Sequence, residues 1–268
     1  MLSVVIPTKF ERKNLQYCIK SINNQILKPD EILIIATSKE TKKIKEFEEN
    51  FDLKVYIEKR QGLSYSRNLG VLKSKGDIIA FIDDDAIAHK KWLYYISKSH
   101  KLKEIGIVGG KIKPIWPKHV SQIIKNSILA REWLSLLDLG KFPFYVDRVI
   151  GSNFSLKREV FNQIGAFNTS IGKYQKLMYG GEETEFCERA GKKFKILYSP
   201  KALVYHKVSA EKLKLKWFIK RSFDSGFNKA KMKRVPKVLA RNPRFNLFDY
   251  ALMFPYLMGY FRAKISNS

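Results

Sequence analysis

Short aliphatic runs alternate with amphipathic stretches along the first part of the chain. The runs are almost continuously apolar and rich in Ile and Val, which is typical of strands in a parallel sheet covered on both faces. They are Leu2–Ile6, Glu31–Ile35, Lys54–Ile57 and Asp77–Ile82. Apolar positions at helical spacing predict helices between them, over Asn14–Gln25, Thr41–Asn50 and Ser64–Ser74. This alternation predicts an α/β fold, a Rossmann-like and mostly parallel sheet flanked by helices.

The pattern becomes less regular after Lys101. Apolar runs predict further strands over Ile105–Ile112, Val149–Leu156, Lys195–Tyr198 and Ala202–His206. Helical spacing predicts helices over His89–His100, Val120–Leu137 and Glu182–Ala190.

Positive charge is concentrated in the last quarter of the chain. The sequence has 51 Lys and Arg against 25 Asp and Glu, a formal net charge of +26. Residues 201–268 hold 16 of the basic and 3 of the acidic side chains, so they carry half of the net charge. Their basic residues interleave with Trp and Phe, and the apolar stretch Leu247–Phe261 follows with the single charge of Asp249. We therefore predict a boundary near residues 207–210 and a basic, aromatic, helical extension over 208–268.

This extension favours an anionic partner. A basic amphipathic segment followed by an apolar one is typical of chains that lie on an anionic membrane surface. The apolar stretch is shorter than the roughly 20 residues that a spanning helix needs. A solvated basic face, or a dimer contact, is the alternative for the extension. For the whole chain, a basic α/β protein that binds nucleic acid is a second hypothesis, although no helix-turn-helix, zinc or RNP pattern occurs.

Composition restricts the remaining classes. With 45% hydrophobic and 13% aromatic residues the chain can bury a large core, which excludes disorder, collagen and coiled coil. Two cysteines, Cys18 and Cys187, cannot form a disulfide scaffold and fit a reducing compartment. The start, MLSVVIPTK, has no basic segment before its apolar run, so we expect no signal peptide and a cytoplasmic protein.

Three adjacent acids, Asp83, Asp84 and Asp85, follow the fourth predicted strand. Ligands bind at the carboxyl ends of strands in such sheets. Repulsion disfavours three charged neighbours unless a cation balances them, and Mg²⁺ and Mn²⁺ combine one or two carboxylates with substrate phosphates. The alternative is an N-cap for the helix His89–His100, for which one Asp would suffice. We therefore predict a divalent-metal site here.

The segment Gln61–Asn68 is a candidate anion site. We predict Ser64 as a helix N-cap, which places Arg67 in the first turn of a helix whose free amides suit a diphosphate. A guanidinium there can bind the diphosphate with two donors. The alternative is an Arg on a solvated helix face.

A pair of acids, Glu182 and Glu183, begins the helix that follows Gly180 and Gly181. Neighbouring carboxylates can differ in pKa and divide the acid and base roles of a reaction, and the glycines permit close backbone approach to a ligand. The alternative is two acids that only complement the helix dipole.

Six short motifs follow one another along residues 2–206. They are PTxxE from Pro7, GLSxxRNxG from Gly62, the DxD of Asp83–Asp85, GSNFSLKRxVFxxIGxF from Gly151, GGEExxFCxRA from Gly180 and LVYH ending at His206. Their order resembles that of the family 2 glycosyltransferases of the GT-A fold. The resemblance implies a GT-A domain over residues 1–207, with a nucleotide-sugar half (1–100) and an acceptor half (101–207). It also implies an inverting, metal-dependent transfer of a hexose from a nucleotide-diphosphate sugar to a hydroxyl of a glycan. The basic extension suits a lipid-linked or cell-surface acceptor, and together with the two cysteines it leads us to expect a protein peripheral on the cytoplasmic face of a membrane.

The resemblance assigns roles to individual residues. The nucleotide sugar is expected to contact Pro7, Thr8, Glu11, Arg67, Asn68, Asp83 and Asp84. Mn²⁺ or Mg²⁺ is expected on Asp83, Asp85 and His206. Glu183 aligns with the catalytic Asp of the family and Glu182 with the Glu before it. The acceptor pocket is expected to include Asn153, Gly181 and Trp133, with Trp133 and Trp116 as sugar platforms or core residues.

Two departures from the family pattern affect these expectations. Many members end the second strand with an acidic stretch whose Asp meets the nucleotide base, whereas this chain has Ala36-Thr37-Ser38. The sequence therefore does not predict the base. Glu183 in place of Asp moves the carboxylate outward by one methylene. A degenerate transferase that serves as a binding subunit is thus a third hypothesis.

Overall fold

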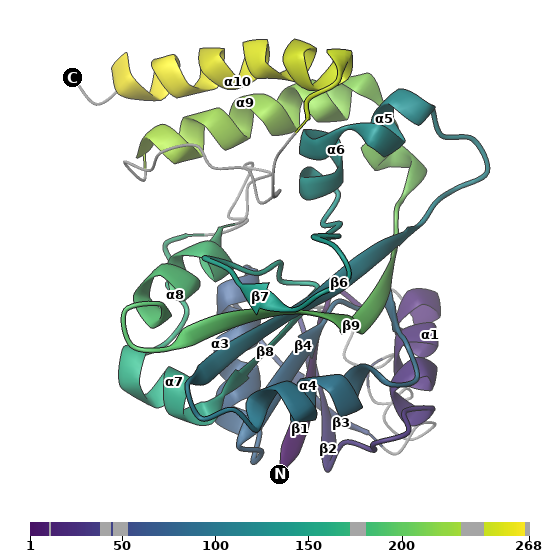
Figure 1. Ribbon diagram of the computed structural model, residues 1–268, viewed down its shortest axis with the longest axis vertical. Helices are drawn as coiled ribbons and strands as arrows, with labels where there is room; N and C mark the ends of the chain where they lie inside the picture. The colour runs from purple at the N-terminus through teal and green to yellow at the C-terminus, as the bar shows by residue number, and fades with distance from the viewer. Residues whose placement is uncertain (11, 38–43, 45–52, 172–180, 232–243, 266–268) are drawn as a thin grey trace.

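The backbone forms one sheet with the strand order β3-β2-β1-β4-β8-β6-β9-β5, and β7 pairs with β9 (Figure 1). The computed structural model describes residues 1–10, 12–37, 44, 53–171, 181–231 and 244–265. The predicted helix Thr41–Asn50 lies, apart from Ile44, outside the described residues.

The first half of the sheet is parallel. It consists of β1 (Leu2–Thr8), β2 (Glu31–Ala36), β3 (Lys54–Ile57) and β4 (Ile78–Ile82), which confirms the four predicted strands. Because parallel strands point the same way, their carboxyl ends meet at one edge of the sheet. The candidate metal and anion residues follow these ends.

The second half of the sheet is mixed. β8 (Asn153–Lys157) is antiparallel to both β4 and β6 (Ile105–Ile115), while β9 (Lys195–Lys207) is parallel to β6. Two short strands, β5 (Ala86–Ala88) and β7 (Phe144–Tyr145), were not predicted and pair with β9.

The prediction of two strands over Lys195–Tyr198 and Ala202–His206 was wrong, because they are one strand. Its pairing with β6 is irregular between Ser199 and Val204, around Pro200. A proline has no N–H to donate to the ladder, and such irregular positions are where strands tolerate it.

Helices cover both faces of the sheet. One core cluster joins Val4 and Ile6 of β1 to α1 (Arg12–Asn23) and α4 (Trp92–His100). A second cluster joins Val5, which points to the opposite face, to helices on the other side. These are α3 (Leu63–Lys73), α7 (Arg158–Ile164) and α8 (Glu182–Ala190).

The predicted single helix Val120–Leu137 was wrong. The segment forms two short helices, α5 (Gln122–Asn126) and α6 (Ile128–Trp133), separated by Ser127 in an extended conformation. Ser127 Oγ accepts a hydrogen bond from the N–H of Ala130 at 2.9 Å, so this serine caps α6 instead of continuing α5.

The basic extension folds into a helical hairpin. A 3₁₀ turn (Ala210–Leu213) leads into α9 (Leu215–Lys231), which packs against α10 (Leu247–Ile265). The two backbones touch at glycines: a Cβ on Gly226 would lie 1.9 Å from the Tyr256 carbonyl oxygen, and one on Gly259 2.1 Å from that of Phe223. Figure 1 shows α10 as the outermost element, with α9 between it and the body. No helix within the described residues has both the length and the apolar content needed to cross a membrane.

The carboxylate of Asp249 joins this hairpin to the body. It is fully buried and accepts hydrogen bonds from Ser127 Oγ at 2.6 Å, from the N–H of Leu129 at 2.9 Å and from the N–H of Asn246 at 2.9 Å. A negative group at the start of α6 also complements the helix dipole. The one charge in the apolar stretch is therefore the group that holds α10 against α6.

Replacing Asp249 should destabilise the protein strongly. Asp249→Ala leaves several buried donors without a partner, so we expect it to lower the free energy of unfolding by about 2–4 kcal/mol. Denaturant unfolding followed by circular dichroism measures this. As a control, Glu211→Ala removes an exposed carboxylate that pairs with Lys214, and it should cost less than about 0.5 kcal/mol. Equal effects of the two substitutions would contradict the role of Asp249.

Candidate active site

An acidic and imidazole cluster lies at the carboxyl end of β4. One ligand atom each from Asp83, Asp85 and His206 lie within 4.8 Å of one another. The antiparallel pairing of β5 with β9 sets Ala86 opposite His206, which brings the imidazole to Asp85. His206 Nε2 is 3.1 Å from Asp85 Oδ1. The alternative of a helix cap is excluded, because α4 begins only at Trp92 and Lys91 precedes it.

The chemistry of this cluster suits a divalent cation. Burial acts to raise the pKa of Asp85, but the hydrogen bond and charge of His206 outweigh it and lower that pKa below its ordinary value. His206 is buried, and its Nδ1 has no hydrogen-bond partner within the described residues. Two carboxylates and one imidazole form a mixed oxygen and nitrogen set of the kind that Mn²⁺ accepts. The cluster therefore fits the metal site predicted from the sequence.

The end of β1 is tied to the same acids. Thr8 Oγ1 donates to a carboxylate oxygen of Asp84 and accepts from the N–H of Phe10 at 2.8 Å. Phe10 has a φ of 71°, a left-handed conformation that is uncommon for a bulky side chain. Pro7 is buried in the strand, and Glu11 lies outside the described residues. Thr8 thus orients Asp84 next to the metal-type cluster.

A buried ion-pair network connects α3 to α8. Arg67 Nη1 is 2.8 Å from Glu182 Oε1, and Arg67 Nη2 is 3.0 Å from Glu183 Oε1. Arg67 and Glu182 are each 1% exposed, while Glu183 is 15% exposed. Sequence reasoning placed Arg67 on the diphosphate and missed these partners. Its helix-cap assignment for Ser64 was wrong: Gly62 precedes α3, and Ser64 Oγ donates to the Asn168 carbonyl.

The electrostatics of this network separate the two carboxylates. Burial, followed by the charge of Glu182, raises the pKa of Glu183, and Arg67 only partly opposes this. Burial would lower the pKa of Arg67, but the charges of Glu183 and Glu182 raise it, so the guanidinium stays protonated. The charge of Asp83 acts on both Arg67 and Glu183. The acidic cluster and the network are therefore electrostatically coupled.

A glycine that sequence reasoning did not single out makes room for the network. A Cβ on Gly151 would lie 1.8 Å from Glu183 Oε1 and 2.3 Å from Arg67 Nη2. Its only sequence signal is its place in the Gly151-Ser152-Asn153-Phe154 segment. Gly181, predicted for the acceptor pocket, has a φ of 138° and donates its N–H to Glu182 Oε2 at 2.9 Å. Gly151 thus leaves room for the Glu183 carboxylate, and Gly181 binds the Glu182 carboxylate through its backbone N–H.

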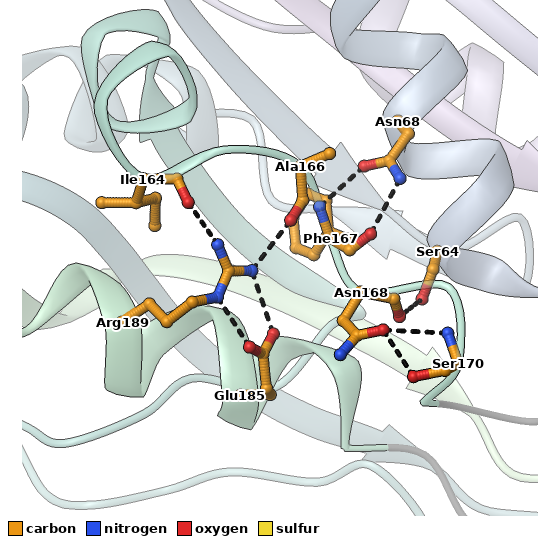
Figure 2. A network of polar contacts seen from close by, with 9 residues as sticks. All are labelled: Ser64, Asn68, Ile164, Ala166, Phe167, Asn168, Ser170, Glu185 and Arg189. Atoms are coloured by element: carbon orange, nitrogen blue, oxygen red, sulfur yellow. Dashed lines mark hydrogen bonds and ion pairs between the residues drawn. The ribbon is translucent and has the colours of Figure 1, made fainter.

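A polar network links α3 and α8 to the end of α7 and the loop that follows it (Figure 2). Arg189 pairs with Glu185 at 2.6 Å and donates to the carbonyls of Ile164 and Ala166. Asn68, predicted to contact the nucleotide, hydrogen-bonds through its amide to the backbone of Phe167, donating at 2.9 Å and accepting at 2.8 Å. These contacts fix the loop between α7 and α8 against α3.

The predicted acceptor side chains pack inside the protein. Asn153 Nδ2 donates to the carbonyls of Lys111 and Ala202, and its Oδ1 accepts from Trp92 Nε1 at 2.8 Å. This amide ties the sheet to α4. Trp133 and Trp116 are both half-buried and pack against the hydrophobic cluster that joins α6 to the hairpin. This packing favours the alternative that they are core residues.

Comparisons with known proteins agree with this chemistry. Residues 3–165, more than half of the chain, match the profile of glycosyl transferase family 2. A glucosyl-dolichyl phosphate glucuronosyltransferase of Haloferax volcanii is 27% identical over 245 residues, covering 86% of this chain and 77% of that protein. Glycosyltransferase AglE of the same organism is 32% identical over 123 residues, 43% of this chain and 40% of its own length.

Solved structures agree on the fold. The mannosyltransferase PcManGT from Pyrobaculum calidifontis, in complex with GDP-Man and Mn²⁺, has a TM-score of 0.64 and 16% identity, covering all of this chain and 76% of that one. GalNAc-T7 with UDP, GalNAc and Mn²⁺ has a TM-score of 0.60 and 20% identity, covering 79% of this chain and 44% of that one. These likenesses confirm the expected GT-A fold.

Gly151→Ala should displace the Arg67–Glu183 pair. We expect it to lower the free energy of unfolding by about 1–3 kcal/mol, because the methyl group overpacks a filled site. In a Glu183→Ala background the same substitution should cost at least about 1 kcal/mol less, since the carboxylate in its way is gone. Denaturant unfolding of the four proteins gives this coupling. Additive costs would show that Gly151 does not make room for Glu183.

Proposed function

This chain belongs to glycosyl transferase family 2, and we propose that it moves a hexose from a nucleotide-diphosphate sugar to a hydroxyl of a lipid-linked glycan, with inversion at the anomeric carbon. One observation carries the proposal: a cation-type cluster and an arginine-held carboxylate share one site at the carboxyl edge of the sheet. Relatives named for a dolichyl phosphate substrate and for Mn²⁺ with nucleotide sugars support the lipid-linked acceptor and the donor. A degenerate transferase would not need to keep both features.

The donor end of the site is assigned to the acidic cluster. Asp83, Asp85 and His206 would hold Mn²⁺ or Mg²⁺, which when bound neutralises charge on the diphosphate as it departs. Asp84, oriented by Thr8, closes the cluster on the side of β1. The diphosphate of a bound donor would therefore contact the residues that follow β1 and β4.

Glu183 is the general base of this proposal. It is the more exposed of the two glutamates, and burial keeps the pKa of its carboxyl raised, toward the pH at which a base works best. Its carboxylate takes the proton of the acceptor hydroxyl as that oxygen attacks the anomeric carbon. Glu182 has no access to solvent and positions Arg67, which in turn orients Glu183 Oε1. Direct attack assisted by one base, opposite the leaving diphosphate, inverts the anomeric carbon.

The hairpin attaches the protein to an anionic membrane surface in this proposal. Exposed large apolar side chains recur at three- and four-residue spacing along α10, which places them on one face; they are Leu247, Tyr250, Met253, Phe254, Leu257, Met258, Phe261 and Ile265. The opposite face of α10 packs on α9. The hairpin also carries exposed cations, with Lys216 and Lys220 on α9 and Arg262 and Lys264 on α10. An apolar stripe on a hairpin with exposed cations suits anionic headgroups over an acyl layer.

Membrane attachment and acceptor binding are linked through α6. Asp249 fixes α10 to the start of α6, and α6 ends at Trp133 in the acceptor half. A lipid-linked acceptor is itself held at the bilayer, so a rigid hairpin brings the site to its substrate. The free, buried Cys18 and Cys187 support placement on the cytoplasmic face.

Substitutions at the two ends of the site should separate binding from turnover. Glu183→Gln should lower nucleotide-sugar turnover by about 10²–10⁴-fold, since the base is lost, while Mn²⁺-dependent stabilisation by nucleoside diphosphate persists. Asp85→Asn should abolish that stabilisation. Turnover is measured as release of nucleoside diphosphate from UDP-, GDP- and dTDP-sugars. The Mn²⁺-dependent stabilisation is measured by thermal shift. Glu159→Gln, on the surface of α7, is the control. Full turnover in Glu183→Gln would remove Glu183 from the mechanism.

The stripe on α10 predicts selective vesicle binding. The double variant Phe254→Ser, Phe261→Ser should bind vesicles of phosphatidylcholine with phosphatidylglycerol at least about tenfold more weakly, since two aromatic side chains no longer enter the bilayer. The control is Phe142→Ser, which removes a 79% exposed ring from the body. Flotation measures binding. Undiminished binding of the double variant, or a preference of the wild type for DNA over vesicles, would favour the nucleic-acid hypothesis or a protein contact.

A further inference from the structure

A series of contacts follows the carboxyl edge of the sheet from the acidic cluster to the edge strand. Thr8 bonds to Asp84, and the N–H of Thr37 donates to the Thr8 carbonyl at 2.9 Å. The N–H of Glu58 donates to the Ala36 carbonyl at 2.9 Å. This series crosses from β4 over β1 and β2 to β3, a span of roughly 14 Å at the usual spacing of strands. In the proposed function, a nucleoside diphosphate held at the cluster would extend its base along this edge.

A fixed guanidinium stands at the far end of this edge. Arg60 donates from Nε and Nη2 to the two carboxylate oxygens of Glu58, both at 2.9 Å, and lies 4.4 Å over the ring of Tyr65. Glu58 is 5% exposed while Arg60 is 66% exposed. The hydrogen bonds to Glu58 also lower the pKa of its carboxyl, so the pair stays charged at neutral pH. Arg60 is thus held in one plane and still faces solvent.

We infer that Arg60, held by Glu58 and Tyr65, reads the nucleobase of the donor by donating to a carbonyl oxygen on its edge. This rests on the proposed function. Glu58 compensates the charge of Arg60, so the pair has little attraction for a phosphate, whereas the guanidinium donors that Glu58 does not take suit a neutral acceptor. Uracil and guanine present such oxygens, and arginine is the usual partner of the guanine acceptors. Adenine presents an amino group there, and the second strand, ending in Ala36-Thr37, offers no carboxylate to accept from it.

Nucleotide selectivity tests this inference. The full chain is titrated with UDP, GDP and ADP in the presence of Mn²⁺, and the wild type should bind UDP or GDP at least about tenfold more tightly than ADP. Arg60→Ala and Arg60→Lys should both reduce this preference to near unity, the second because lysine keeps the charge but loses the planar fork. Tyr65→Leu should reduce it in part. Affinity for ADP should stay within about twofold throughout, and Lys59→Ala, next to Arg60 and exposed, should change nothing.

The outcomes distinguish the inference from the function on which it rests. An equal loss of affinity for all three nucleotides in Arg60→Ala would assign Arg60 to the phosphates and overturn the inference. So would a wild type that binds the three equally, or a preference that survives Arg60→Ala, and in these cases the transferase proposal stands. Failure of every nucleotide to bind with Mn²⁺ would overturn both.

Discussion

The buried pairing of Arg67 with two glutamates is the constraint on which the site depends. A guanidinium removed from water is costly unless charged partners in good geometry compensate it, and Glu182 and Glu183 do so at 2.8 Å and 3.0 Å. Arg67 and Glu182 are 115 positions apart in the sequence. The pair therefore forms only when α3 and α8 have both packed on the sheet, so that folding the core and assembling the site are one event.

Aromatic packing supports this charge network. Phe167 stacks on Phe186 with ring centroids 4.1 Å apart, and Phe81 stacks on Phe154 at 4.7 Å. The Arg67 guanidinium lies 5.6 Å from the centre of the Phe154 ring and 5.9 Å from that of Phe167. Contacts between a cation and ring faces gain strength when water is excluded. The two rings thus pack against the same guanidinium that the glutamates pair with.

The sequence predicted what local pattern determines, and missed what distant partners determine. The parallel strands and the Asp83–Asp85 cluster follow from short apolar runs and from the rule that ligands meet the carboxyl ends of strands. The role of Arg67 could not be read locally, because a helix-start arginine beside Gly and Ser has the same pattern whether it faces a phosphate or a carboxylate.

The break at Ser127 has a similar cause. Asp249, which accepts the hydrogen bond of Ser127 Oγ between the two short helices, comes from the far end of the chain. The apolar spacing of Val120–Leu137 alone could not predict this partner. The same limit applies to Asn153 and Asn68. Their motif positions were recognised, but the partners that occupy their amides, at Trp92 and at Phe167, lie on other elements.

The two arginines of the site, Arg67 and Arg60, are both paired with glutamates, and this limits how the site can balance a diphosphate. Arg67 is committed to the glutamates and Arg60 to Glu58, so neither guanidinium is available in full to balance a departing diphosphate. In the proposed function the diphosphate lies close to Asp83, Asp84 and Asp85, which are themselves negative. Without a cation, the site would repel its own leaving group. In the proposed mechanism the buried arginine therefore positions the base, and because it is committed to the glutamates, a divalent ion at the acidic cluster would have to balance the leaving diphosphate.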